Sequence, residues 1–422
     1  IMSGQITNNV FRASGVIAPT AGGLSWSSAI ITGSTVTVEA SNGYWINTTS
    51  NACTVTLPSS AEIGDQIVLA DYARTWSTNN VIIDSNGLNF QGDPDTYTVD
   101  YSTAGQSLSI VYSDATKGWV PISDDAVAKD HTPPPTQKAI FGYGYAGGYV
   151  SMSNLVSSSG VIATDVSGVG TARDGLAGDS YGGDKAIFGY GYNGGNLSLT
   201  NLVSSSGVVA TDVSGVGTAR RELAAAGYGV GLAIFGYGYT STAVSLTNLV
   251  SYSGVVATDT SGVGTVRYAP AATRYGTDKA IFGYGSILSS PYYVSMTNLV
   301  SNVGVVATDV TGVGTTRTRG SATVYGSTGQ AMFGYGQPAI AITNLITNVG
   351  VVGSDVSGVG TARWGLGGSP YGGDKAIFAY GSTGSDVSMS NLVNNVGVVA
   401  SDVTGVGTAR SALAAAGYSI TA

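Results

Sequence analysis

The sequence predicts an all-β protein in which a β-sandwich is followed by a six-bladed β-propeller. The first observation is a string related to Lys-Ala-Ile-Phe-Gly-Tyr-Gly, which begins at Lys138 and occurs six times at intervals of 45 to 51 residues. The second is that the repeats lack the 3.6-residue apolar period of a helix. The third is a composition with 63 glycines and only 10% charged residues, which suits short strands joined by tight turns.

The residues before the repeats divide into three parts. Residues 1–24 show no clear strand pattern, and we expect them to form an arm. Residues 25–127 contain alternating segments such as Thr54-Val-Thr-Leu and Ser107-Leu-Ser-Ile-Val-Tyr, which predict strands and a jelly-roll-like β-sandwich. Residues 128–137 include a run of prolines, which predicts a semi-rigid linker.

Each repeat within residues 138–422 reads as four short strands. In the third repeat the expected strands cover residues 223–229, 233–238, 244–250 and 254–259. The first is rich in alanine and small enough to lie near a central axis. Four strands in about 45 residues, repeated, are typical of propeller blades, and the alternative of a β-solenoid usually has shorter rungs.

The two ends of the repeat region predict how the ring closes. The first repeat begins at Lys138, in what should be a second strand, whereas the last ends with Ala412-Leu-Ala-Ala-Ala-Gly-Tyr, which resembles a first strand. We therefore expect residues 412–418 to pair beside residues 138–144. This pairing would leave neither strand with a free edge.

An arginine and an aspartate recur at fixed places in every repeat. The arginines are Arg173, Arg220, Arg267, Arg317, Arg363 and Arg410, and eight residues or so before each lies one of Asp165, Asp212, Asp259, Asp309, Asp355 and Asp402. The planar guanidinium group suits bidentate bonds, so we interpret these residues as structural, with Asp–Arg pairs or arginine–carbonyl bonds holding the fourth strand to the next blade. An anion-binding ring around the channel is the alternative.

The positions that vary between repeats predict a binding face. They are the residues that follow the repeated arginines and the long loop 286–293, all of which should emerge on one face of a propeller. Aromatic and charged side chains at such positions are typical of a receptor contact, and idle surface variation is the alternative. The candidate receptor-binding residues are Arg221, Tyr268, Tyr292, Tyr293, Arg319 and Trp364.

Composition argues against several other functions. The repeats contain neither histidine nor cysteine, so we expect no metal site, no cofactor and no catalytic residues there. One arginine per blade at equivalent places also differs from the single asymmetric arginine cluster of a sialidase. A net charge of −8 without clustered cations argues against nucleic-acid binding. No run of 18 apolar residues occurs, so we expect no membrane insertion.

The order of the strands resembles kelch repeats. Arg-x-x-Leu-Ala-Ala-Ala-Gly-Tyr-Gly and Ala-Ile-Phe-Gly-Tyr-Gly occupy the first two places of that pattern. Gly-Tyr-Gly stands where kelch repeats have a glycine pair, and the outer-strand tryptophan is absent, so the resemblance concerns architecture.

Two further strings resemble bacteriophage tail and fibre proteins. One is the N-terminal stretch that begins at Gly43-Tyr-Trp-Ile-Asn-Thr-Thr and ends near Lys117-Gly-Trp-Val-Pro, and the other is the propeller repeat itself. The resemblance implies a non-enzymatic virion protein of a phage tail or fibre that binds a host receptor, either a glycan or an outer-membrane component. It further implies a homotrimer whose N-terminal region contacts other tail proteins.

Two alternatives to receptor binding remain at this stage. One is a virion decoration or adaptor protein that binds no receptor. The other is a glycan depolymerase, which would need a pair of carboxyl groups in one pocket.

Overall fold

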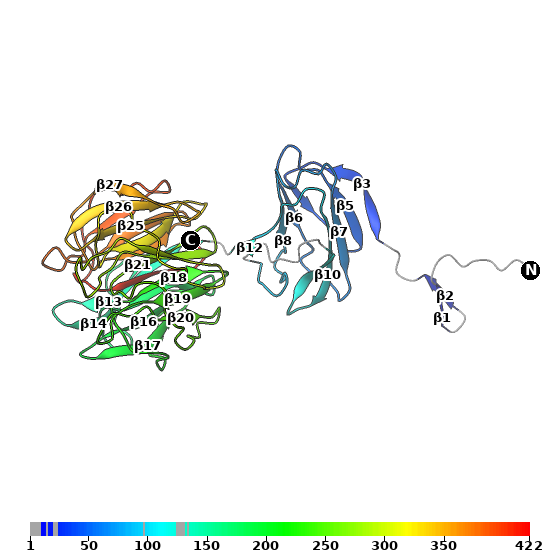
Figure 1. Ribbon diagram of the computed structural model, residues 1–422. Coiled ribbons are helices and arrows are strands. Elements are labelled where there is room, and N and C mark those ends of the chain that lie inside the picture. Colours follow the sequence, from blue (N-terminus) through cyan, green and yellow to red (C-terminus); the bar gives the residue numbers. More distant parts are fainter. Residues whose placement is uncertain (1–9, 14–15, 20–23, 96–97, 124–130, 133–134) are drawn as a thin grey trace, which may run out of the picture. The chain divides into compact units, whose positions relative to one another are not determined.

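The structure is a computed structural model that describes residues 10–13, 16–19, 24–95, 98–123, 131–132 and 135–422. The described residues form strands, turns and loops and contain no helix, which confirms the all-β prediction. It follows that no described segment is an apolar helix long enough to cross a membrane. The chain divides into two compact units, residues 1–133 and residues 134–422 (Figure 1), which are described separately below.

The described residues of the first unit form one short two-stranded sheet and two five-stranded sheets. The two-stranded sheet pairs β1 (Val10–Ala13) with β2 (Val16–Pro19), a pair that the sequence did not predict because each strand is only four residues long. One sheet has the order β11 (Gly118–Ser123), β10 (Ser107–Asp114), β7 (Gln66–Asp71), β5 (Asn42–Ile46) and β3 (Ser25–Ile31). The other has the order β12 (His131–Thr132), β9 (Thr98–Tyr101), β8 (Val81–Asp84), β6 (Cys53–Thr56) and β4 (Thr35–Thr37).

The strand pairing of these two sheets differs from that of a jelly roll. From β3 to β8 the chain alternates between the sheets, and each strand lies parallel to the strand two places earlier, as in β3–β5–β7 and β4–β6–β8. Only the later strands, such as β10 and β11, pair antiparallel. Side chains alternate between the two faces of a strand in parallel and antiparallel sheets alike, so the sequence pattern could not separate the two.

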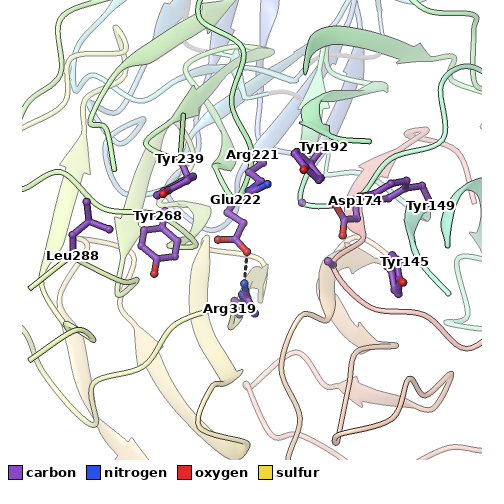
Figure 2. A pocket seen from close by; sticks show the side chains of 12 residues that line it. Tyr145, Tyr149, Asp174, Tyr192, Arg221, Glu222, Tyr239, Tyr268, Leu288 and Arg319 are labelled. Atoms are coloured by element: carbon purple, nitrogen blue, oxygen red, sulfur yellow. Dashed lines mark hydrogen bonds and ion pairs between the residues drawn. The ribbon is translucent and has the colours of Figure 1, made fainter. Parts of the chain in front are cut away.

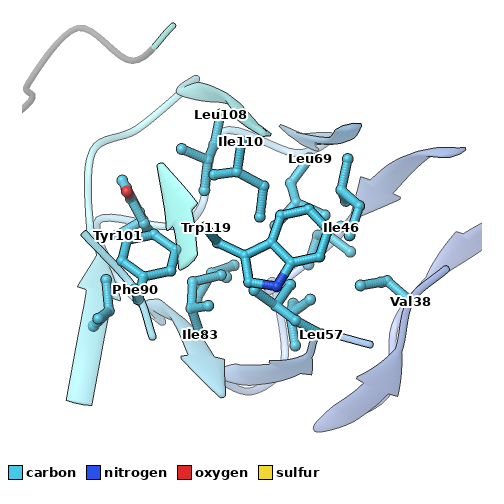
Figure 3. Close-up of a cluster of buried hydrophobic side chains, with 14 of the residues drawn as sticks. Val38, Ile46, Leu57, Leu69, Ile83, Phe90, Tyr101, Leu108, Ile110 and Trp119 are labelled. Carbon is cyan, nitrogen blue, oxygen red and sulfur yellow. The ribbon is translucent and has the colours of Figure 1, made fainter. Parts of the chain in front are cut away.

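The core of the first unit draws side chains from both sheets. Trp119 is fully buried, and Figure 3 shows it among Ile46, Leu57, Leu69 and Ile110. Full burial of a leucine or isoleucine side chain stabilises a fold by about 1.5–3 kcal/mol. The alternating apolar residues that predicted strands are therefore the residues that hold the two sheets together.

The second unit consists of six small antiparallel sheets, one for each repeat. Five have three strands and one has four. In order along the chain they are β31 (Ala414–Tyr418), β13 (Lys138–Tyr145) and β14 (Tyr149–Val156); β15 (Ala177–Tyr181), β16 (Lys185–Tyr192) and β17 (Asn196–Val203); β18 (Ala224–Tyr228), β19 (Leu232–Gly236) and β20 (Thr247–Val250); β21 (Ala271–Tyr275), β22 (Lys279–Gly283) and β23 (Thr297–Val300); β24 (Ser321–Tyr325), β25 (Gln330–Gly336), β26 (Ile340–Ile346) and β27 (Val352–Val356); β28 (Gly367–Tyr371), β29 (Lys375–Ala379) and β30 (Ser390–Val393).

The C-terminal strand completes the first of these sheets. β31 pairs antiparallel with β13, with Lys138 opposite Tyr418 and Gly142 opposite Ala414, which confirms the predicted pairing. The first strands of the six sheets contact one another in a closed cycle, β15 with β18, β21, β24, β28 and β31 in turn and β31 with β15 again. We call this arrangement of residues 135–422 the six-sheet ring.

The end of the expected linker belongs to this ring. The Gln137 backbone N–H donates to the carbonyl of Ser419, and the Gly372 N–H donates to the carbonyl of Gln137. Thr136 is buried. The linker predicted at residues 128–137 therefore overlaps the second unit, because a chain that enters a closed ring must satisfy its own backbone groups there.

The predicted fourth strand is regular in one sheet only, where it is β27. In the other five sheets single bridges replace it, for example between Val250 and Val256 and between Thr247 and Thr260. The Asn248 side chain donates to the Ala257 carbonyl at 3.0 Å and to Asp259 Oδ1 at 2.9 Å, so it occupies the place where the strand ladder is interrupted. The recurring Asn-Leu motif thus replaces part of a backbone ladder with a side chain.

Each Gly-Tyr-Gly motif bends the second strand of its sheet toward the next sheet. Tyr143 has a φ of 63°, and the pairing register of β13 shifts between Gly142 and Gly144. Its ring meets Phe188 of the following sheet edge to face, with centroids 5.6 Å apart. The equivalent contacts run around the ring to Tyr380 and Phe141. A left-handed tyrosine costs about 1–2 kcal/mol, which this buried contact offsets.

Candidate functional site

The repeated arginines lie between neighbouring sheets. Arg220 is fully buried, and its Nε donates to the Tyr237 carbonyl at 2.8 Å while Nη2 donates to Asn248 Oδ1 at 2.7 Å. Its guanidinium carbon lies 4.3 Å from the centroid of the Tyr190 ring, which belongs to the preceding sheet. All six arginines are 0–1% exposed. Buried groups with these partners favour the structural interpretation over an anion-binding ring.

The repeated aspartates bond to the preceding repeat and not to the arginine of their own repeat. Asp259 Oδ2 accepts hydrogen bonds from the Thr218 backbone N–H at 3.0 Å and from the Thr218 Oγ1 hydroxyl at 2.6 Å. Its Oδ1 lies 3.9 Å from Arg220 Nη1. The set closes with Thr408 and Asp165. Burial raises the pKa of Asp259, but the hydrogen bonds from threonine and asparagine outweigh it and hold the pKa below its usual value.

A closed ring of backbone hydrogen bonds lies at one end of the six-sheet ring. It is formed by the second residue after each repeated arginine, and each N–H donates to the carbonyl of the preceding member over 2.6 to 3.1 Å. All six members have a φ between 47° and 64°. They are Gly175, Glu222, Ala269, Arg319, Gly365 and Ala412.

Two members of this ring depart from the small residues found at the other four. Glu222 and Arg319 carry long charged side chains at left-handed positions, where glycine is favoured. Their side chains form an ion pair with each other, although Ala269 separates them in the backbone ring. Strained backbone positions of this kind concentrate at functional sites. Glu222 and Arg319 therefore indicate that this face of the six-sheet ring is the candidate functional face.

A pocket of about 430 Å³ lies over this backbone ring (Figure 2). An arc of aromatic side chains borders it, beginning with Tyr145, Tyr149 and Tyr192, whose neighbouring rings meet edge to face at 5.8 and 6.0 Å. Arg221 continues the arc, with its guanidinium carbon 4.3 Å from the Tyr192 ring centroid and 5.4 Å from that of Tyr239. The pocket is lined by Tyr145, Tyr149, Asp174, Gly175, Tyr192, Arg221, Glu222, Tyr239, Tyr268, Leu288, Arg319 and Ala412.

A second hollow of about 330 Å³ adjoins the first and shares Asp174, Glu222 and Arg319 with it. Trp364 borders it, half-buried, with the Arg319 guanidinium carbon 5.4 Å from its ring centroid. It is also lined by four leucines, each directly before a first strand: Leu176, Leu223, Leu366 and Leu413. We call the two hollows together the axial pocket.

The structure brings together four of the six candidate receptor-binding residues. Arg221, Tyr268, Arg319 and Trp364 all line the axial pocket. Tyr292 and Tyr293 do not line it. Tyr292 is 60% exposed on the loop surface, and Tyr293 borders a separate hollow near β23.

The loop of residues 286–293 explains why these two tyrosines lie elsewhere. The Ile287 N–H donates to the Tyr292 carbonyl at 2.8 Å, and Ser286 forms a bridge with Tyr293, so the loop folds back on itself. This turn directs Leu288 to the pocket in place of the tyrosines. A tight turn was not readable from the length of the loop alone.

The residue directly after each repeated arginine is not exposed in every repeat. Thr318 and Ser411 are buried at this position. The larger residues at the equivalent places, Tyr268 and Trp364, keep part of their surface exposed.

Several pocket residues were not predicted although the sequence held a signal. Tyr145, Tyr192 and Tyr239 directly follow Gly-Tyr-Gly in the first three repeats, where the later repeats have serine or glutamine. The aromatic arc therefore covers one side of the ring and gives the pocket its asymmetry.

Asp174 has an unusual environment within the axial pocket. Burial, and to a smaller extent the nearby Glu222 carboxylate, raise its pKa to about 6 against the opposing effect of Arg221 and Arg319. No hydrogen bond or ion pair joins its carboxylate to another side chain among the described residues. Asp174 thus presents a carboxyl group that has no side-chain partner among the described residues.

No protein-family model matches this chain, and no curated protein matches it. In the described part of the chain, no three His, Cys, Asp or Glu side chains lie close enough together to hold a metal ion. The groups that the axial pocket offers to a ligand are aromatic rings, tyrosine hydroxyl groups, guanidinium groups and carboxyl groups.

Proposed function

We propose that this chain is a non-enzymatic structural protein of a bacteriophage tail fibre that binds a host-surface receptor, a glycan or an outer-membrane component, through the axial pocket. The observation that carries the proposal is the contrast between the repeated framework and the pocket. Arginine, tyrosine and aspartate contacts recur in every repeat, whereas the residues that line the pocket differ from repeat to repeat. Recognition of a receptor in one orientation needs such asymmetry.

We also propose that the six-sheet ring is a kelch-like, six-bladed β-propeller that follows an N-terminal β-sandwich. Six antiparallel sheets, the cycle of contacts between their first strands and the completion of the first sheet by β31 support it. A fibre tip built in this way presents one face of the ring to the host.

The chemistry of the axial pocket suits a surface glycan. Aromatic faces stack on the apolar faces of sugars, and partly exposed tyrosine and tryptophan side chains are typical anchors of binding sites. The Glu222–Arg319 ion pair and Asp174 add polar groups that can bond to hydroxyl groups.

A depolymerase remains the second candidate because Asp174 and Glu222 lie in one pocket. Glycoside hydrolysis uses two carboxyl groups, one of them protonated. However, the Glu222 carboxylate is already engaged in an ion pair with Arg319, so receptor binding without cleavage is favoured. Incubation with host polysaccharide separates the candidates. Shortening of the polysaccharide chains would indicate an enzyme, and binding without shortening would indicate a receptor-binding fibre. If the protein neither binds nor shortens the polysaccharide, a decoration or adaptor protein is indicated.

Replacing both Trp364 and Tyr268 with alanine should weaken binding to host cells tenfold or more. Each substitution removes an aromatic face from the axial pocket, and loss of such anchors costs about 1.4 kcal/mol or more. Cell binding of the labelled full chain measures the effect. The matched control is Tyr292→Ala, which removes an exposed tyrosine outside the pocket and should leave binding unchanged. A folded double variant that binds normally would place the receptor site elsewhere.

The first unit should carry the contacts that assemble the fibre and join it to other tail proteins in the virion. Trp26 and Trp45 stack with centroids 4.3 Å apart on the outer surface of a sheet, where they remain 42% and 38% exposed. Exposed aromatic pairs of this kind are typical of association surfaces. The arm expected at residues 1–24 lies mostly outside the described residues.

Light scattering should therefore report an oligomer, expected to be a trimer, for the full chain and a monomer for residues 134–422. The shorter fragment retains every strand of the six-sheet ring together with Gln137. A stable oligomer of this fragment would contradict the assignment of assembly to the first unit.

A further inference from the structure

One side of the axial pocket combines a free carboxylate with three aromatic rings. Asp174 pairs through its backbone with Tyr192, and Figure 2 shows its side chain on the same side of the pocket as Tyr145, Tyr149 and Tyr192. The three rings form a continuous row with neighbouring centroids 5.8 and 6.0 Å apart. Three aromatic rings and a carboxylate therefore border the same volume.

The other charges of the pocket already have partners. Glu222 and Arg319 form an ion pair, and the Arg221 guanidinium group lies over the rings of Tyr192 and Tyr239. Asp174 is the one pocket carboxylate with no side-chain partner among the described residues. When it is ionised, its negative charge is not held in an ion pair, and the nearby Arg221 guanidinium group stays over the tyrosine rings.

We propose that this side of the axial pocket binds an organic ammonium group of the receptor, such as the amine of an amino sugar or a choline headgroup. The attraction between a cation and aromatic faces is strongest when the cation is partly desolvated, as it would be beside these rings. An N-acetylated or neutral sugar can stack on the rings but offers Asp174 no charge. The inference rests on the proposed function, since it assigns the chemical class of the receptor.

The protonation of Asp174 gives this site a pH dependence. The groups that face it are Glu222, Arg221, Arg319 and Tyr149. Because its pKa is raised to about 6, the carboxylate is ionised at pH 7.5 and about nine-tenths protonated at pH 5. Choline keeps its charge over this range, so its affinity should fall about tenfold as the pH decreases.

The test is a calorimetric titration of the full chain at pH 7 with choline, glucosamine and N-acetylglucosamine. The proposal expects choline or glucosamine to bind at least tenfold more tightly than N-acetylglucosamine, and the better of the two identifies the source of the ammonium group. Asp174→Asn should lower that affinity tenfold or more and abolish its pH dependence. Asp386→Asn, on the loop between β29 and β30 and not among the residues that line the axial pocket, is the control and should have no effect.

If neither choline nor glucosamine binds more tightly than N-acetylglucosamine, or if the Asp174→Asn variant binds unchanged, the proposal is overturned. The cell-binding assay with the Trp364 and Tyr268 variant is independent of these results. Loss of cell binding there, together with failure of the ammonium titrations, would leave the receptor-binding function standing and exclude only the ligand class. Normal cell binding by that variant would overturn the function itself.

Discussion

Deleting residues 411–422 should leave the six-sheet ring unable to fold stably. The deletion removes β31, which is paired along its length with β13 and also contacts β15 and β28. Leu413 and Tyr418 are among the buried side chains that would be lost. The truncated chain would have an open strand edge on β13 and a gap in the cycle of first strands.

The size of the effect follows from what is removed. Burial of a side chain such as Leu413 contributes about 1.5–3 kcal/mol, and each net backbone hydrogen bond contributes about 0.5–1.5 kcal/mol. Five residue pairs between β31 and β13 are lost together. The sum is comparable with the whole stability of a typical domain, about 5–15 kcal/mol.

Circular dichroism melting of the full chain and of the truncated chain measures this prediction. Deletion of Thr421 and Ala422 alone is the control, because both are exposed and neither belongs to β31. The control should melt close to the intact chain. A truncation at residue 410 that melts at the same temperature as the intact chain would contradict the closure argument.

The repeat explains why the second unit was largely predictable. A repeat that begins at its second strand must obtain its first strand elsewhere, and the C-terminal Leu413-Ala-Ala-Ala-Gly-Tyr was the one segment with that pattern left over. The pairing of β31 with β13 follows from this argument. The hydrogen-bond partner of each repeated aspartate could not be predicted in this way. Six equivalent copies leave open whether a contact lies within one repeat or between two neighbouring repeats.

The first unit was less predictable for a physical reason. Strands such as β6 and β7 show the expected alternation of buried and partly buried residues. That alternation fixes which side chains enter the core, but it is the same for parallel and antiparallel neighbours. The connections between sheets, which decide the direction of each strand, leave no comparable pattern in the sequence.

The candidate site was predicted where it departs from the repeat. Arg221, Tyr268, Arg319 and Trp364 stand at places that other repeats fill differently, and all four line the axial pocket. Tyr292 and Tyr293 of the 286–293 loop do not line the pocket, because a local turn decides which side chain of this loop points toward it. The left-handed backbone ring beneath the pocket could not be read from residue types, since glutamate and arginine rarely adopt that conformation.

Replacing Arg220 with methionine should destabilise the six-sheet ring by about 3–5 kcal/mol, the range for breaking a buried charged network by removing one partner. The variant keeps most of the side-chain volume but leaves Asn248 Oδ1 and the carbonyls of Tyr237 and Thr218 without their donor. It also removes the cation from the Tyr190 ring. Because Arg220 joins two neighbouring sheets, the loss should weaken the ring as a whole.

The neighbouring Arg221 provides a matched control for this prediction. Arg221→Met changes the same residue type one position later, but its guanidinium group lies in the axial pocket over Tyr192 and Tyr239, where such a contact is worth about 0.5–1 kcal/mol. Urea denaturation should therefore show a large loss of unfolding free energy for Arg220→Met and a small one for Arg221→Met, whereas receptor binding at equal folded fraction should respond to Arg221 alone. Equal stability of the two variants would mean that the repeated arginines do not hold the sheets together, and their recurrence in all six repeats would then need a functional explanation.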